Sequence, residues 1–257
     1  MAGRPRKTFT QVVEAVIAQS DVVIEVLDAR MIDETRHAPM EEMVHRLGKR
    51  LITVINKADL APREYLLSKK KELENCIFLS TKDRDGVGKL RAYIYQVAAK
   101  SKDEQIVVGV VGYPNVGKSS VINSLAGRAS AAVSSRSGHT RGKQKIRVSE
   151  RLQIIDTPGV IPMTEMDSNR LALLSSKNVD QVQDPELVAV NILHTFKARD
   201  TLEVIERKFD VKLQGTDAYE WIVQIAKARN RLKAGGVPDI ETISRLIIQD
   251  WQRGLLK

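Results

Sequence analysis

Residues 112–119 begin with Gly112 and end with Gly117, Lys118 and Ser119. This sequence matches the phosphate-binding loop pattern G-x-x-x-x-G-K-S/T. An apolar, β-branched run at 106–111 precedes the loop and an amphipathic segment at 119–125 follows it, so we expect a strand, the loop and a helix in succession. In that context backbone N–H groups can turn toward the oxygens of a diphosphate, where the amino end of the helix adds partial positive charge. The flanking elements disfavour the alternative, a chance glycine-rich turn.

The side chains of this loop have separate expected roles. Lys118 would reach the β- and γ-phosphates of a nucleotide, and the Ser119 hydroxyl would be a ligand of Mg²⁺. Asn115 belongs to a G-x-P-N loop, a type that resembles loops binding K⁺ near the β- and γ-phosphates, where the cation would act as an arginine finger does; the use of K⁺ stays open here. The expected nucleotide-binding residues of the loop are Asn115, Val116, Gly117, Lys118, Ser119 and Ser120.

A second motif, Asn56-Lys57-Ala58-Asp59, follows an apolar run at 51–55 that predicts a buried strand. Guanine presents two adjacent donors that the Asp59 carboxylate can accept, whereas adenine has an acceptor at that edge. Two charge-assisted hydrogen bonds at about 1.5–3 kcal/mol each predict a preference for GTP over ATP on the order of 10² to 10⁴. Asn56 would tie this motif to the phosphate loop, and the Lys57 stem would cover one face of the base. A capped turn is the alternative for the motif taken alone.

Three further segments complete the expected site. Ser80, Thr81 and Lys82 follow a third expected strand at 77–79 and resemble the S-A-K loop of GTPases, which contacts the guanine oxygen through backbone N–H groups. The polar, basic stretch 134–143 has the composition of a switch loop, in which Thr140 would complete the Mg²⁺ shell. The strand at 152–155 leads into a D-x-x-G element, whose Asp orients a Mg²⁺ water and whose Gly senses the γ-phosphate. The catalytic candidates are Lys118, Thr140, Gly159 and Asn115, and the metal ligands are Ser119, Thr140 and Asp156.

The order of these motifs is unusual, because N-K-x-D and S-x-K precede the phosphate loop, whereas ordinary GTPases begin with that loop. The order results if the termini of an ordinary GTPase are joined and the chain is opened again after D-x-x-G. The strands can still form the same sheet, since the termini of compact domains often lie close together. The chain therefore resembles the circularly permuted GTPases of the YlqF (RbgA) type, which belong to the TRAFAC class and act in ribosome assembly. The resemblance rests on D-A-R at 28–30, G-x-P-N-V-G-K-S at 112–119 and D-W-Q-x-G at 250–254.

This resemblance implies an α/β fold, a P-loop GTPase sheet with helices on both faces, and a cytoplasmic protein that binds large-subunit rRNA or precursor particles and hydrolyses GTP. One departure is the segment 4–9, where bacterial members carry an F-P-G-H-M stretch, so no catalytic role of that His is carried over. Hydrolysis is expected to be slow, because Ras-like enzymes place a Gln after D-x-x-G and this chain has Val160 there.

We expect a permuted G domain over residues 1–164 and a smaller all-helical domain over 165–257. The chain leaves D-x-x-G directly for the second domain, so switch II would itself connect the two. Acidic residues at 184, 200 and 217 predict three capped helix starts. In the helix expected over 217–233, an apolar face would include Trp221, Ile222, Ile225, Ala228 and Leu232.

Charge and composition limit the kinds of partner that this chain can have. The 257 residues include 41 Lys and Arg against 32 Asp and Glu, a net charge of +9 that suits a polyanion such as rRNA; solubility charge is the alternative. One Cys and no apolar run near 18 residues predict a cytoplasmic protein without disulfides or membrane spans. We expect a monomer and no DNA partner. Candidate phosphate contacts are the switch loop, Arg4, Arg6, Lys7, Lys227 and Arg231.

Two classes of function stay open. One is an enzyme that binds GTP/GDP with Mg²⁺ and acts on large-subunit rRNA or precursor particles. The other is a GTP-dependent binding switch for tRNA or a protein partner, in which hydrolysis is incidental.

Overall fold

The chain forms two compact units, Met1–Pro162 and Met163–Lys257. The computed structural model describes residues 9–73, 75–99, 105–127, 144–156, 173 and 178–257. The elements of the first unit are α1 (Phe9–Gln19), β1 (Val22–Asp28), α2 (Ile32–Thr35), α3 (Ala38–Arg46), β2 (Arg50–Asn56), η1 (Ala58–Leu60), α4 (Arg63–Glu72), β3 (Cys76–Leu79), α5 (Val87–Ala98), β4 (Ile106–Val111), α6 (Lys118–Ala126), β5 (Gln144–Arg147) and β6 (Leu152–Asp156).

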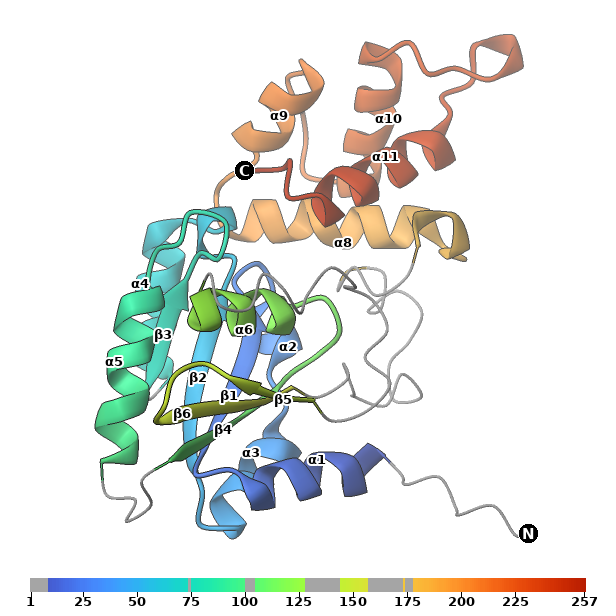
Figure 1. Ribbon diagram of the computed structural model, residues 1–257. Coiled ribbons are helices and arrows are strands. Elements are labelled where there is room, and N and C mark those ends of the chain that lie inside the picture. The colour runs from blue at the N-terminus through green and yellow to red at the C-terminus, as the bar shows by residue number, and fades with distance from the viewer. Residues whose placement is uncertain (1–8, 74, 100–104, 128–143, 157–172, 174–177) are drawn as a thin grey trace, which may run out of the picture. The chain divides into compact units, whose positions relative to one another are not determined.

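A six-stranded sheet in the order β3-β2-β1-β4-β6-β5 is the centre of this unit, with helices on both of its faces (Figure 1). Five strands are parallel and β5 pairs with β6 in the antiparallel direction. From β1 the chain adds β2 and β3 toward one edge, and from β4 it adds β6 toward the other. The neighbours β1 and β4 therefore form a topological switch point, where open α/β sheets bind ligands beyond the carboxyl ends of their strands.

Buried side chains hold the helices against the sheet. Every residue of β1 is buried, as expected of a parallel strand covered on both faces. One apolar cluster joins α1 and α3 to Val23 and Val111, and a second joins α2 and α4 to Leu27 and Ile55. On the other side, α5 contacts β1 and β3, and α6 contacts β4 and β6. The predicted fold class is thus confirmed.

The strand β5 is the main element that the sequence did not predict. Its four residues, Gln144–Arg147, are mostly polar and stand inside a basic segment, so no apolar run marks them. Antiparallel pairing at an edge of the sheet does not require burial of both faces, which explains why so polar a segment can form a strand.

The second unit is helical in its described part. Its elements are η4 (Val179–Gln181), α8 (Pro185–Ala198), α9 (Glu203–Phe209), α10 (Ala218–Ala228), η5 (Ala234–Gly236) and α11 (Ile240–Gln252). Trp221 and Trp251 are almost completely buried in its core, and the rings of Trp251 and Phe196 meet edge to face with centroids 6.0 Å apart. None of the helices in the described ranges combines the length and apolarity needed to span a membrane.

Two sequence predictions for this unit are wrong. Asp184 and Asp217 cap α8 and α10 through their side chains, but Asp200 has a left-handed φ of 53° and α9 begins after Leu202 without a side-chain cap. The predicted apolar face ends early: Ala228, the last residue of α10, is exposed, and Leu232, which lies beyond the helix, is 43% exposed.

Glu25 is the fully buried carboxyl group in the middle of β1, and it yields a stability prediction. Its Oε1 accepts the N–H of His37 at 3.0 Å, while Oε2 has no hydrogen-bond partner among the described residues. Burial, together with the neighbouring Glu41 carboxylate, raises the pKa of Glu25 from 4.5 to about 8. The unfolded chain therefore ionises Glu25 near pH 4.5 while the folded chain keeps it protonated, so this group lowers stability as pH rises from about 4.5 to 8.

We expect Glu25→Gln to raise the free energy of unfolding on the order of 2–3 kcal/mol at pH 7, because the amide keeps the acceptor oxygen without the ionisation penalty. The gain should shrink toward zero near pH 4. Urea unfolding across this range measures it, with Glu42→Gln on the exposed side of α3 as control. A gain that is constant with pH would show that Glu25 is ionised in the folded protein.

Candidate functional site

Four loops meet at one edge of the sheet because they follow the carboxyl ends of adjacent parallel strands. Asp28 ends β1, Asn56 ends β2, Ser80 follows β3 and Gly112 follows β4. The motifs that the sequence separates by about 60 residues are therefore neighbours in space, on both sides of the switch point between β1 and β4.

The phosphate loop depends on backbone conformations that favour glycine. Gly112 has a φ of 139° and Gly117 a φ of 101°, and a Cβ on Gly112 would lie 2.5 Å from the carbonyl oxygen of Val26. Asn115 also has a positive φ, 61°, which asparagine tolerates better than most residues. No side chain caps α6, so the first N–H groups of that helix are donors suited to a phosphate.

Lys118 is held inside this loop. Its Nζ donates to the carbonyl oxygens of Gly112 at 2.9 Å and Tyr113 at 2.6 Å, and only 6% of the residue is exposed. The ammonium is thus already positioned within the curve of the loop, where the phosphates of a nucleotide could replace the two carbonyl oxygens as its partners.

Two contacts join the N-K-x-D motif to the phosphate loop. Asn56 Nδ2 donates to the Val116 carbonyl at 3.0 Å, and Lys57 Nζ donates to the Asn115 carbonyl at 2.7 Å. Asn56 Oδ1 is buried and has no hydrogen-bond partner among the described residues. The link that the sequence assigns to Asn56 is present, and Lys57 adds a second one.

Asp28 is the residue that sequence reasoning missed. Its Oδ2 lies 2.6 Å from Lys57 Nζ and 2.7 Å from Arg30 Nη2, and its Oδ1 accepts the backbone N–H and the Nε–H of Arg30 at 3.0 Å each. Asp28 and Arg30 are 3% and 2% exposed. The i, i+2 spacing in D-A-R was the available signal, but the sequence alone does not show that a lysine 29 residues later completes the group.

Burial and the neighbouring charges shift the pKa values of Asp28 and Lys57. Burial by itself would raise the pKa of Asp28, but the Arg30 guanidinium and the Lys57 ammonium hold it well below its usual range. Burial lowers the pKa of Lys57 more than Asp28 raises it. Removing one partner of such a buried group leaves an uncompensated charge, which typically costs about 3–5 kcal/mol.

The expected base-reading residues also lie together. Asp59 Oδ1 is 2.9 Å from Ser80 Oγ, and Ser80 Oγ is also 3.0 Å from Asp83 Oδ2. Ser80 is buried, Thr81 is half-buried and Lys82 is exposed. The structure therefore brings the S-x-K loop next to Asp59, although the two segments are about 20 residues apart.

The expected metal ligands are only partly described. Ser119 and Ser120 are exposed at the start of α6, and Asp156 ends β6, where the strand register pairs it with Val110. Hydroxyl and carboxylate oxygens are ligand types that Mg²⁺ prefers. Thr140 and Gly159 lie outside the described residues, as do Arg4, Arg6, Lys7 and the whole of the expected switch loop at 134–143.

A comparison with protein families matches residues 107–223 to a model described as "50S ribosome-binding GTPase". The match begins in β4, so the N-K-x-D motif at 56–59 precedes it in the chain although β2 belongs to the same sheet. This is the arrangement that a circular permutation produces.

Curated relatives cover almost all of this chain. An uncharacterized GTP-binding protein of Methanocaldococcus jannaschii is 37% identical over 248 residues, 96% of this chain and 65% of the relative. Nuclear/nucleolar GTPase 2 of Arabidopsis thaliana is 33% identical over 93% of this chain and 42% of its own length, and GTPase grn1 of Schizosaccharomyces pombe is 31% identical over 100% and 62%. The chain thus spans less than two thirds of the length of these relatives.

Two solved structures of YlqF from T. maritima share the fold. The GNP-bound structure aligns with a TM-score of 0.58 and 24% identity over 94% of this chain and 92% of that chain. The GDP-bound structure aligns with the same TM-score and identity over 94% of each.

Gly117 yields a test of the link between Asn56 and the phosphate loop. A Cβ at this position would lie 2.1 Å from Asn56 Nδ2, so Gly117→Ala should break the bond to Val116 and leave a buried amide unpaired. We expect a loss of about 1–3 kcal/mol in the free energy of unfolding beyond the cost of the positive φ.

Gly127→Ala is the matched control at the other end of α6. Gly127 has a φ of 65°, but its Cβ would meet no atom within 4 Å, so this variant isolates the backbone strain. Equal losses for the two variants in urea unfolding would mean that the link to Asn56 contributes nothing to stability.

Proposed function

Since the chain belongs to the circularly permuted GTPases that include YlqF and the nucleolar GTPases, we propose that it binds GTP and GDP with Mg²⁺ and hydrolyses GTP while acting on large-subunit rRNA or its precursor particles. The observation that carries the proposal is the pair of links from Asn56 to Val116 and from Lys57 to Asn115. They join a guanine-reading motif to a phosphate loop across one edge of the sheet.

We assign each part of the nucleotide to this edge. Asp59 accepts the two donors of guanine, and backbone N–H groups of Ser80, Thr81 and Lys82 contact the base oxygen. The loop from Asn115 to Ser120 and the Lys118 ammonium hold the phosphates. Mg²⁺, which would neutralise developing charge on the phosphates, would be held by Ser119, Thr140 and Asp156.

A nucleotide-dependent connection between the units is part of the proposal. The chain passes from the D-x-x-G element at 156–159 into the second unit, which begins at Met163. We propose that the G domain spans residues 1–164 and that switch II acts directly on the helical domain at 165–257.

The positive charge supports an RNA partner. Within the helical unit, Arg231, Arg245 and Arg253 line a groove of about 440 Å³ together with Gln249 and Gln252. Arg231 was a candidate phosphate contact from the sequence, and it lies on this groove with two arginines that the sequence did not single out. The word "nucleolar" in the name of a relative and the family description "50S ribosome-binding GTPase" favour ribosomal RNA over tRNA.

The base assignment predicts a change of nucleotide preference. Asp59→Asn exchanges an acceptor for a donor, so affinity for GTP should fall by 10²-fold or more, on the order of two lost charge-assisted bonds, and xanthosine triphosphate should bind better than GTP. Equilibrium binding of fluorescent GTP, ATP and XTP analogues measures this. Asp83→Asn is a control, because Asp83 also lies by Ser80 but is not assigned to the base. ATP binding as tight as GTP binding in the native protein would contradict the role of Asp59.

The hydrolysis step yields a separate prediction. With Val160 after D-x-x-G, turnover by the protein alone should be slow, since no glutamine orients the water. We expect the single-turnover rate to be higher in KCl than in NaCl, to lose this difference in Asn115→Ala, and to rise further with large ribosomal subunits but not with tRNA.

The hydrolysis measurements with ribosomal subunits and with tRNA distinguish the two candidate functions. Stimulation by tRNA alone would favour the binding switch over the assembly factor. Equal rates in KCl and NaCl for the native protein would remove K⁺ from the mechanism and leave the GTPase assignment untouched.

A further inference from the structure

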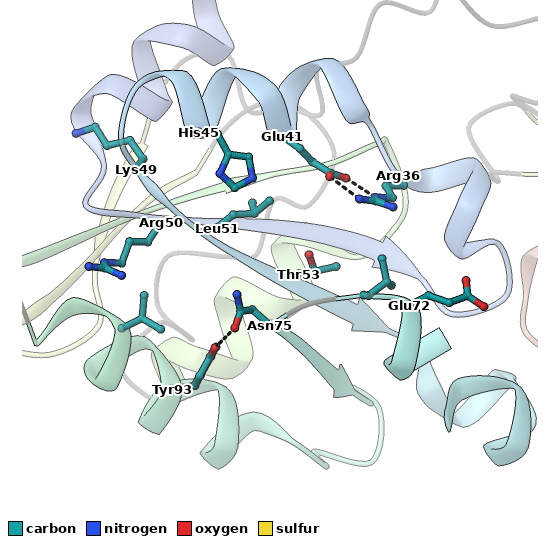
Figure 2. A pocket seen from close by; sticks show the side chains of 12 residues that line it. Arg36, Glu41, His45, Lys49, Arg50, Leu51, Thr53, Glu72, Asn75 and Tyr93 are labelled. Carbon is teal, nitrogen blue, oxygen red and sulfur yellow. Dashed lines mark hydrogen bonds and ion pairs between the residues drawn. The ribbon is translucent and has the colours of Figure 1, made fainter. Parts of the chain in front are cut away.

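A second groove lies at the opposite end of the strands from the nucleotide edge. Figure 2 shows the side chains that line it. Its volume is about 570 Å³, and it is lined by residues of α3, α5, the end of α4 and the start of β2. Arg50 is the first residue of β2 and Asn75 immediately precedes β3, so the groove lies by the amino ends of these strands. None of the nucleotide motifs contributes to it.

The carboxylates that line the groove are already paired. Arg36 donates to both oxygens of Glu41, at 2.6 and 2.7 Å, and Lys69 Nζ lies 2.8 Å from Glu72 Oε2. The neighbouring Glu25 adds little negative charge at neutral pH, because burial and Glu41 raise its pKa to about 8. The acidic groups near the groove are therefore neutralised by side chains of the protein itself.

The remaining basic side chains have no such partners. Lys49, Arg50 and His45 line the same groove, and in the described part of the chain none of their side chains makes a hydrogen bond or ion pair. Figure 2 shows His45 on α3 above the strand, with Lys49 and Arg50 at the same end of the groove. The basic side chains of Lys49, Arg50 and His45 are thus left for an anion from outside the chain.

An aromatic side chain forms another part of the wall. Tyr93 of α5 is half-buried, and its hydroxyl donates to Asn75 Oδ1 at 2.7 Å, which fixes the direction of the ring. Proteins that bind single-stranded nucleic acid combine a positively charged groove with aromatic rings on which bases stack. A volume of 570 Å³ is also within the range of sites that enclose a ligand of nucleotide size.

We propose that this groove binds a single-stranded segment of RNA, with Lys49, Arg50 and His45 contacting phosphates and Tyr93 stacking on a base. The inference rests on the proposed function in that it takes RNA as the partner. It places an RNA contact on the G unit, separate from both the nucleotide edge and the groove of the helical unit.

The test compares two charge-reversal variants of the full chain. Lys49→Glu/Arg50→Glu changes the groove, while Lys70→Glu/Lys71→Glu makes the same change of charge on exposed residues of α4 that do not line it. Affinity for a fluorescein-labelled 12-nucleotide uridylate RNA is measured by anisotropy between 50 and 200 mM KCl. We expect the groove variant to bind at least ~10-fold more weakly and to lower the slope of log affinity against log salt by about 1.4, the value for two phosphate contacts to a single strand.

Tyr93 provides an independent readout. Tyr93→Leu should weaken RNA binding by ~5-fold or more without changing the salt slope, whereas Tyr93→Phe, which keeps the ring, should bind as the native protein does. Binding of a fluorescent GDP analogue to every variant reports whether the G unit is still folded.

The outcomes separate this inference from the proposed function. Equal losses for the two charge-reversal variants, or no loss in the groove variant, would overturn the groove as an RNA site while leaving RNA binding elsewhere intact. Inorganic phosphate or uridine monophosphate that competes as well as the 12-nucleotide RNA would show that the groove takes a small phosphate compound instead. A native protein that binds GDP but no RNA would contradict the RNA partner itself.

Discussion

The ammonium of Lys57 lies between the carboxylate of Asp28 and the carbonyl oxygen of Asn115, and the arrangement of the candidate site depends on this contact. One lysine thereby connects the end of β1, the end of β2 and the loop after β4. Because Asp28 and Arg30 are almost fully buried, loss of either partner would leave an uncompensated charge in the interior. The geometry of the phosphate loop is thus coupled to that of the N-K-x-D motif.

This coupling explains why the order of the motifs in the chain matters little. All of them follow carboxyl ends of parallel strands, so the sheet brings them to one edge whichever strand the chain forms first. The permutation changes what is connected, because the chain leaves D-x-x-G for the helical unit rather than returning to the sheet. The matched part is 42% to 65% of the length of the three curated relatives, so they contain further residues beyond those that align with this chain.

Much of the fold and part of the site could be predicted from the sequence. The buried strands carry β-branched apolar runs, and the phosphate loop, N-K-x-D and D-x-x-G have spacings tied to their chemistry. The strand β5 has no apolar run, and Asp200 adopts a left-handed turn where a cap was expected. The Asp28–Lys57 contact and the groove by Arg50 depend on side chains that only the folded chain brings together, so no local pattern could reveal them.

A crystal structure of the protein with GDP and Mg²⁺ tests the central claim most directly. We expect the base within hydrogen-bond distance of Asp59 and the phosphates inside the loop from Gly112 to Ser119. Lys118 Nζ should have moved from the carbonyl oxygens of Gly112 and Tyr113 toward the β-phosphate, while Lys57 keeps its contacts with Asp28 and Asn115. A nucleotide bound elsewhere, or a base recognised without Asp59, would contradict the account.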